Sequence, residues 1–335
     1  MPRPADTYSL VADIGGTNTR VALALGRDLL PGTIRRYRNA DHAGLESVLR
    51  AFIAEEEDVD CKGACVAVAG PVHDGRATLT NLDWTIDRAT VARAARAETV
   101  AVLNDLQAQG HALGHIAPEN LRTVIPGPAE PMGRTRLVIG VGTGFNCAPV
   151  FETPAGRVVP PSEAGHSGLP VRSEADLRLL REVETIHGFP SVEDVLSGRG
   201  LERIYRWAAE EAGTPAERRA AEIVAACADG SDPVAREAVR SFARILGTEA
   251  GNLALIFLPF GGVYLIGGVM RHVAPFLDAF GFDAAFRDKG RFAGFMSNFG
   301  VHVVEDDYAA LVGAAAHLTD LFGMAAKDGS RVTGP

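Results

Sequence analysis

The sequence has 335 residues, of which 47% are hydrophobic and 22% are charged, a composition typical of a globular protein with a sizeable core. This length favours about two domains rather than one. The formal net charge of −9 disfavours a general surface for nucleic acid or for an anionic membrane, whereas a local site for an anionic nucleotide is compatible with it.

The cysteines and the termini point to an intracellular protein. None of the four cysteines is part of a Cys-x-x-Cys pair, so we expect buried, reduced thiols and no zinc: Cys61, Cys65, Cys147 and Cys227. Residues 1–6 lack the apolar core of a signal peptide. The uncharged segment 251–270 is long enough to span a membrane, but Pro259 interrupts it, and a helix end followed by a buried strand explains it better. We therefore predict a cytoplasmic protein with no membrane partner.

The first informative stretch is a strand that ends in glycines. Residues 9–14 form a mostly apolar run that delivers Asp13 just before a turn. The alternating pattern of residues 21–25 predicts a second strand rather than a helix, so the turn is the tip of a hairpin made of Gly15, Gly16, Thr17 and Asn18. This excludes the P-loop and the dinucleotide fingerprint, which both lead from a strand into a helix. A hairpin tip is most often only a turn, but a preceding carboxylate indicates a metal-bound phosphate.

The next hundred residues alternate between helices and strands. Apolar spacing predicts helices over 45–53, 87–97 and 107–113, and apolar runs predict strands over 64–69 and 99–103. This is an α/β layout. The proline-rich segment 118–131 has little periodicity and suggests a connection between two lobes.

The remainder repeats the alternation with longer helices. Strands are predicted over 136–141, 263–266 and 301–304, with further β-structure over 147–151 and 157–159. Helices are predicted from Ser173 onward, from Pro233 at the first position of a long helix, over 273–280 and over 308–322.

Two more glycine turns follow apolar strands. They are Gly142-Thr143-Gly144 and Gly267-Gly268. Strand ends need turns, but three turns of similar build suggest two lobes that present backbone N–H groups to phosphates. The first of the two resembles the start of a dinucleotide fingerprint, but Phe145 occupies the position of the third glycine and no helix pattern follows, so NAD is disfavoured.

Several polar residues could be structural or functional. Asn104 and Asp105 lie between a strand and a helix, where a helix cap is the commoner role and a general base at the carboxyl end of a strand is the functional one. Glu163 and His166 lie in an irregular loop and could be solvated or bind a polyhydroxylated ligand. Glu193 lies at a predicted helix start, where an acid complements the helix dipole.

Taken together, these motifs resemble the bacterial glucokinases that lack a zinc motif, within the actin-like sugar kinases. The resemblance extends over nearly the whole chain and rests on segments 10–18, 103–105, 140–144, 163–166, 193–198, 251–255, 260–268 and 286–292. It implies an α/β, two-lobed, actin-like (ribonuclease H-like) ATPase fold with mixed sheets and a central cleft. The small lobe would comprise residues 1–115 plus about 308–335, and the large lobe residues 116–307. A homodimer is also implied.

The resemblance also implies roles for the candidate residues. Asp105 would be the general base that accepts the proton of the 6-hydroxyl of glucose during phosphoryl transfer from ATP. The other hydroxyls would be held by Asn104, Glu163, His166 and Glu193. The phosphates would be wrapped by Gly15, Gly16, Thr17, Asn18, Gly142, Thr143 and Gly144, with Gly267 and Gly268 beside the nucleoside. Asp13 would place Mg²⁺ through water.

The chain departs from the family pattern at two places. Ala164 precedes Gly165 where the family has two glycines, and Phe145-Asn146 replaces a Leu-Gly pair. Three other functions are alternatives. A kinase for mannose, fructose or an amino sugar would differ only in pocket shape. A sugar-sensing repressor would need an N-terminal helix-turn-helix, for which a first strand starting near residue 8 leaves no room. A silent actin-like ATPase or scaffold would tolerate the loss of Asp105, yet Asp105 is present together with all the expected sugar-contact residues.

Overall fold

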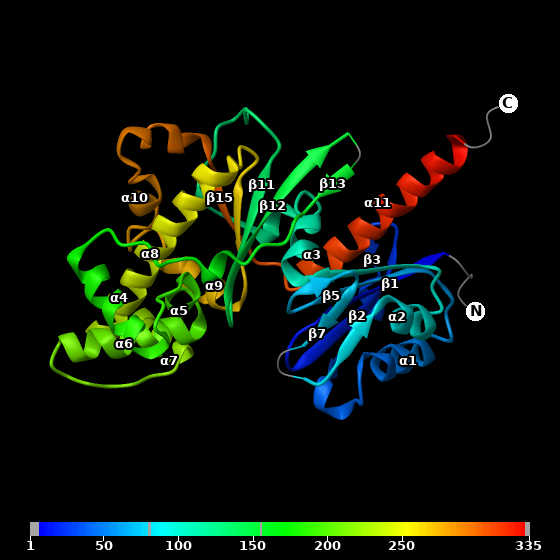
Figure 1. The fold of residues 1–335 in the computed structure, drawn as a ribbon, viewed down its shortest axis with the longest axis horizontal. Coiled ribbons are helices and arrows are strands. Elements are labelled where there is room, and N and C mark those ends of the chain that lie inside the picture. Colours follow the sequence, from blue (N-terminus) through cyan, green and yellow to red (C-terminus); the bar gives the residue numbers. More distant parts are fainter. Residues whose placement is uncertain (1–6, 80–81, 155, 332–335) are drawn as a thin grey trace. The chain divides into compact units, whose positions relative to one another are not determined.

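The computed structural model describes residues 7–79, 82–154 and 156–331. Within them the chain divides into two compact units. Unit 1 comprises the described residues of 1–117, 152–159 and 306–335, and unit 2 comprises residues 118–151 and 160–305. Each unit contains a sheet that mixes parallel and antiparallel pairs, so the predicted α/β class with mixed sheets is confirmed (Figure 1).

Unit 1 is built on a central sheet in the order β3-β2-β1-β5-β9, with β4 paired to β2. The predicted hairpin is present, because β1 and β2 pair antiparallel, while β1, β5 and β9 run parallel. A small second sheet has the order β6-β7-β8. The strands are β1 (Tyr8–Ile14), β2 (Asn18–Leu25), β3 (Asp28–Leu29), β4 (Arg35–Arg38), β5 (Cys61–Val68), β6 (Val72–His73), β7 (Arg76–Thr78), β8 (Thr85–Asp87) and β9 (Thr99–Asn104).

Helices cover both faces of this sheet, as the alternation of side chains along β1 requires. On one face, Leu10, Ala12 and Ile14 belong to a cluster with the buried side chains of α1 (Leu45–Glu55) and α2 (Arg88–Ala95). Val11 points into the other cluster, with α3 (Asp105–Ala112) and α11 (Ala309–Arg331). The C-terminal helix therefore belongs to the N-terminal unit (Figure 1).

Residues 152–159 also belong to unit 1, although the elements on either side of them in the chain lie in unit 2. The physical reason is Arg157 in β13 (Gly156–Val158), whose side chain is only 10% exposed. Its Nη1 donates to the carbonyl oxygens of His111 and Leu113 at the end of α3, both at 2.7 Å. At the other end of α3, the Gln107 side chain donates to the carbonyl of Val159 at 2.8 Å.

The second large sheet has the order β10-β15-β14-β11-β12-β13, and its strands lie in unit 2 except for β13 and the end of β12. Again a hairpin lies beside a parallel strand, because β11 pairs antiparallel with β12 and parallel with β14. Besides β13, its strands are β10 (Leu121–Ile125), β11 (Arg136–Val141), β12 (Phe145–Thr153), β14 (Val263–Ile266) and β15 (Val301–Val304). The helices of unit 2 are α4 (Glu174–His187), α5 (Val192–Val195), α6 (Gly198–Glu211), α7 (Ala220–Asp229), α8 (Pro233–Phe257), α9 (Gly268–Val273) and α10 (Phe282–Arg287).

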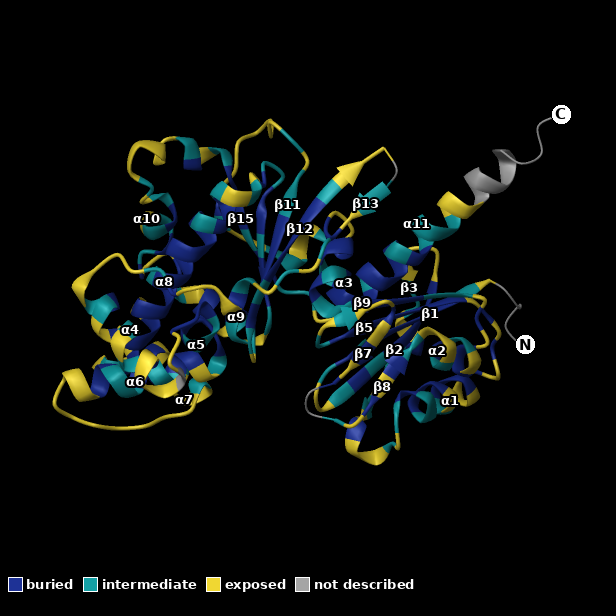
Figure 2. Ribbon diagram, viewed as in Figure 1, coloured by how far each residue is buried: buried dark blue, intermediate teal, exposed yellow. Residues whose placement is uncertain are grey.

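The long helix α8 is the centre of the unit 2 core. Pro233 is its first residue, as predicted, and the Asp232 side chain caps it. Val239, Phe242 and Leu246 are fully buried, and they belong to one large cluster with β11 and β14. In Figure 2 the central strands of both units are mostly dark blue, and the exposed colour lies on outer helix faces, on loops and on peripheral strand positions such as the end of β12.

Two segments differ from the sequence expectation. The presumed connection 118–131 contains strand β10, which pairs with β15; its two consecutive exposed residues, Arg122 and Thr123, interrupt the apolar alternation that would have marked a strand. The helix predicted over 273–280 is wrong: helix α9 covers Gly268–Val273 and ends where the prediction begins, and a 3₁₀ turn, Ala274–Phe276, follows it.

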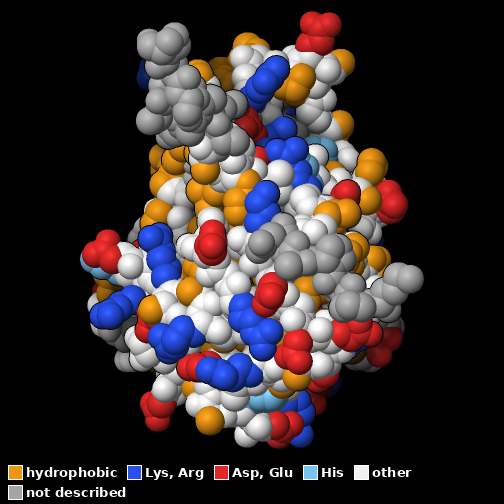
Figure 3. Space-filling view, turned by 90° about the vertical axis from the view of Figure 1, so that its right-hand side faces the viewer, with side chains coloured by type: hydrophobic (Ala, Val, Ile, Leu, Met, Phe, Trp, Pro, Cys, Tyr) orange, Lys and Arg blue, Asp and Glu red, His pale blue; other side chains and the backbone are white. Residues whose placement is uncertain are grey.

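The distribution of surface charge and the hydropathy of the helices agree with the composition. On the face drawn in Figure 3, basic and acidic side chains are intermingled rather than gathered by sign. Among the described residues, no helix is long and apolar enough to cross a membrane. Segment 251–270 is the end of α8 followed by β14, as predicted.

Candidate active site

In unit 1, the candidate residues gather at one edge of the sheet. Ile14 lies beside Val68, and Val68 lies beside Asn104, so the carboxyl ends of three parallel strands are in register. Asp13 is one residue before this level and Asp105 one residue after it. Open α/β sheets bind ligands at this edge.

The β1–β2 turn is held by hydrogen bonds from Asn39, a residue that nothing in the sequence singles out. Asn39 is buried, and its Nδ2 donates to the carbonyl of Gly15 at 2.7 Å. Its backbone N–H donates to the carbonyl of Thr17 at 2.9 Å, and its Oδ1 accepts from the Thr19 hydroxyl at 2.8 Å. The turn is therefore fixed before any ligand arrives, which lowers the entropic cost of binding a phosphate there.

Asp13 is the candidate metal-binding carboxylate. Burial raises the pKa of Asp13, and Arg20, whose Nη1 lies 3.3 Å from Oδ2, opposes that rise. No group of three or more His, Cys, Asp or Glu side chains that could hold an ion occurs among the residues that the structure describes. A single carboxylate nevertheless fits Mg²⁺, which is commonly held by one or two carboxylates, several waters and the phosphates of a substrate.

Asn104 and Asp105 combine the two roles that their position suggested. Asn104 caps α3, because its Oδ1 accepts from the N–H of Leu106 and its own N–H donates to the Gln107 side chain. Its Nδ2 donates to the carbonyl of Gly70 at 3.0 Å. Asp105 follows as the first residue of α3, half-buried at the sheet edge. The cap thus fixes the backbone that presents the Asp105 carboxylate.

In unit 2, the second glycine turn is pinned by Glu193. The N–H of Phe145 donates to the Glu193 carboxylate at 3.0 Å. A Cβ on Gly144 would meet the same carboxylate, so a side chain there would push Glu193 away from the turn. The carbonyl of Gly142 accepts from the N–H of Gly198, which places the turn at the N-terminus of α6. Such a helix end favours negative charge.

Glu163 precedes the short 3₁₀ turn Ala164–His166 and His166 is its last residue; their side chains are 66% and 67% exposed and 4.0 Å apart. Gly165 lies against the carbonyl of Phe145, too close for any Cβ. The Ala164 methyl packs against the unit 2 core. Of the two adjacent positions where the family has glycine, Gly165 therefore requires it, whereas position 164 has room for the alanine methyl group.

A hollow of about 630 Å³ adjoins this turn within unit 2. Gly142, Thr143 and Gly268 line it together with mostly apolar side chains of α6, α7 and α9, among them Leu201 and Val224. Three polar side chains also reach it: Arg199, Glu202 and His272. Gly267 has φ +117° and lies against the carbonyl of Val141, so glycine is required there too. A glycine turn next to a mostly apolar hollow suits a nucleotide, because backbone N–H groups bind phosphates and an apolar pocket binds a base.

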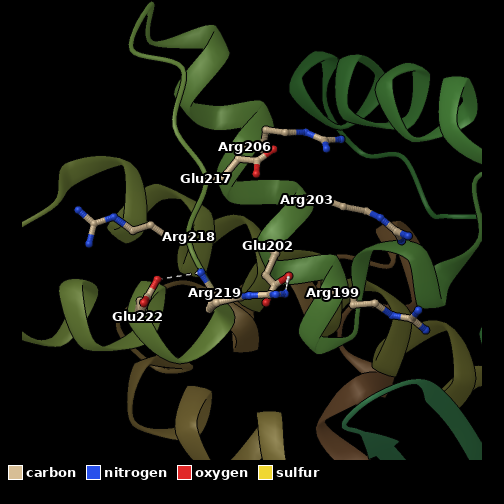
Figure 4. A pocket seen from close by; sticks show the side chains of 8 residues that line it. All are labelled: Arg199, Glu202, Arg203, Arg206, Glu217, Arg218, Arg219 and Glu222. Carbon is tan, nitrogen blue, oxygen red and sulfur yellow. Dashed lines mark hydrogen bonds and ion pairs between the residues drawn. The ribbon is translucent and has the colours of Figure 1, made fainter. Parts of the chain in front are cut away.

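A second hollow of about 460 Å³ lies between α6 and the start of α7 (Figure 4). It has many arginines, but Arg219 is paired with Glu202 at 3.5 Å, and Figure 4 shows Arg203 and Arg206 pointing away from that pair. Arg203 is bound to Asp194 at 2.8 Å. Arg206 and Arg218 pair with Glu182 and Asp232, so most of the arginines of this hollow already have a carboxylate partner, which weakens it as an anion site.

Comparison with known proteins gives one consistent result. A sequence profile of the family described as "Glucokinase" matches residues 10–321. A glucokinase of Mesorhizobium japonicum is 34% identical over 333 residues, covering 97% of both chains. A glucokinase of Brucella abortus is 35% identical over 308 residues, covering 92% of this chain and 90% of that one. The crystal structure of a glucokinase from an Antarctic psychrotroph superposes with a TM-score of 0.83 at 30% identity, covering 93% of this chain and 98% of that one.

Proposed function

The chain belongs to the glucokinase family and is an enzyme of ATP-dependent glucose phosphorylation, and on that premise we propose that Asp105 is its general base. The observation that carries this assignment is the position of Asp105 at the aligned carboxyl ends of β1, β5 and β9, on a backbone fixed by the Asn104 cap. The positive end of α3 favours the ionised carboxylate.

The proposed reaction is a single displacement. The Asp105 carboxylate accepts the proton of the glucose 6-hydroxyl as that oxygen forms a bond to the γ-phosphorus of ATP. The bond from the γ-phosphorus to the β–γ bridging oxygen breaks, and ADP leaves. A positioned base contributes about 10²–10⁴-fold, and most of the remaining acceleration comes from alignment and charge neutralisation.

We assign the other sugar hydroxyls to Asn104, Glu163, His166 and Glu193. Carboxylates and amides suit this task, because a site built to hydrogen-bond a hydroxyl rejects a ligand that lacks it. The Glu193 carboxylate that pins the second glycine turn would then contact the sugar as well, so the two ligand sites share a residue.

The phosphates are assigned to the turns at residues 15–18 and 142–144, and the nucleoside to the hollow beside Gly267 and Gly268. Asp13 would hold Mg²⁺ through water, and Mg²⁺ when bound neutralises charge on the phosphates. The fixed backbone of both turns, supported by Asn39 and Glu193, supplies N–H groups without reorganisation.

We further propose that units 1 and 2 are the two lobes of the enzyme, and that it is a cytoplasmic homodimer. The four cysteines support the compartment, because all are buried and none is disulfide-bonded. The dimer rests on the family resemblance, and sedimentation of the purified protein tests it.

The test of the function is a coupled assay of sugar 6-phosphate formation with Mg-ATP and a panel of hexoses, on the wild type and on Asp105→Asn. We expect a strong preference for glucose and a loss of about 10²–10⁴ in kcat for the variant. Asn retains an oxygen for the N–H of Leu106, so the fold is preserved. Turnover of another hexose in preference to glucose would change the assigned substrate. Sugar binding without any turnover would contradict the enzyme and favour a sugar sensor.

A further inference from the structure

We propose that Asn146 is a positioning residue that holds the loop of residues 162–166, here the sugar loop, and thereby sets the affinity for the sugar. This inference rests on the proposed function, which assigns Glu163 and His166 to sugar hydroxyls. Asn146 is one of the two positions where the chain departs from its family's pattern.

The Asn146 amide is bonded to the sugar loop through both of its ends. Its Nδ2 donates to the carbonyl of Ser162. Its Oδ1 accepts from the Ser162 hydroxyl at 2.9 Å and from the N–H of Ala164 at 3.0 Å. Because the amide is planar, three bonds in different directions fix both the distance and the orientation of residues 162–164 relative to β12.

The strand that carries Asn146 is a rigid support. Asn146 pairs with Gly140 of β11, and its neighbour Phe145 is held by Glu193. The sugar loop, in contrast, has only a single 3₁₀ turn, and its two functional side chains are mostly exposed. The position of Glu163 therefore depends on the amide that ties its neighbours to the strand.

A direct contact between Asn146 and the sugar explains these observations less well. Its Oδ1 already accepts from the N–H groups of Cys147 and Ala164, at 2.8 and 3.0 Å, and shares the single proton of the Ser162 hydroxyl with the carbonyl of Cys147. An amide oxygen offers two lone pairs, so Oδ1 has no capacity left for a sugar hydroxyl, and one of the two Nδ2 hydrogens is already donated to Ser162. The effect of Asn146 on the sugar is transmitted by the loop.

The test is Asn146→Asp, which keeps the shape and replaces the Nδ2 donor with an oxygen facing the carbonyl of Ser162. We expect the KM for glucose to rise roughly tenfold, as the loss of one or two half-buried hydrogen bonds implies, with the KM for Mg-ATP within about twofold of wild type. The matched control is Asn298→Asp, whose half-buried Nδ2 donates to the carbonyl of Phe295 at 2.8 Å in the same unit. It should leave both KM values unchanged.

Ser162→Ala is a second, milder variant that folds more readily, since it only removes the hydroxyl bonded to Asn146 and to the carbonyl of Cys147. It should raise the KM for glucose in the same selective way. Equal changes in both KM values accompanied by a lower melting temperature, or values matching Asn298→Asp, would overturn the inference. Glu163→Gln is measured in parallel: if it leaves the KM for glucose unchanged, the sugar assignment fails and takes the inference with it.

Discussion

Replacing Arg157 with Met should destabilise unit 1 far more than the loss of an ordinary ion pair. Arg157 donates to the carbonyls of His111 and Leu113, and its Nη2 and Nε bond Glu152 at 2.6 and 3.0 Å. The methionine retains most of the apolar stem but none of the five donors. The last carbonyls of α3 then lose their cap in a site where the arginine side chain is 10% exposed.

The expected magnitude follows from the bonds that are lost. Hydrogen bonds to a charged group contribute about 1.5–3 kcal/mol each, and neighbouring bonds are not additive, so we expect a loss of roughly 2–4 kcal/mol. Urea unfolding followed by circular dichroism, with activity recorded along the same curve, measures it. Because α3 presents Asp105, kcat should fall as well.

The matched control is Arg178→Met, which removes an exposed pair with Glu211 at 2.9 Å. Exposed pairs contribute about 0–1 kcal/mol, so this variant should unfold close to wild type. If the two variants unfold at the same urea concentration, the cap on α3 does not stabilise the unit and the reasoning from burial is wrong.

Three further outcomes are expected. Gly165→Ala should lower kcat/KM for glucose by at least about tenfold, because its Cβ meets a backbone carbonyl of β12 that cannot move freely, whereas Gly168→Ala, whose Cβ meets nothing nearer than 3.9 Å, should match wild type in the same assay. Asn39→Ala should raise the KM for Mg-ATP and reduce stability by about 1–3 kcal/mol, since it leaves buried partners unpaired; unchanged kinetics would contradict its role at the turn. Burial, with His317 beside it, lowers the pKa of His111 to about 3, so the unfolded chain binds a proton below about pH 6.5 that the folded chain does not. The free energy of unfolding should therefore decrease as the pH is lowered below about 6.5, by up to about 1.4 kcal/mol per pH unit for this group. In urea unfolding at pH 7 and pH 5, His111→Leu should lose less of its stability at pH 5 than the wild type does.

Local patterns determined most of the secondary structure. The alternation in residues 9–25 predicted the hairpin, and Pro233 marked the start of α8, because both signals lie within a few residues of the element that they specify. The family also followed from sequence, since its motifs are short and keep their order. The assigned roles of Asp105 and Glu163 remain predictions.

The supports of the site were decided only by tertiary structure. Asn39 reaches a turn more than twenty residues away, Asn146 reaches a loop sixteen residues on, and Arg157 caps a helix that ended some forty-five residues earlier. Nothing local marks these side chains, because an asparagine or arginine becomes a support only when strand register and packing bring a carbonyl within reach. The same holds for Gly165, whose need for glycine comes from the atoms that fill the space a Cβ would take.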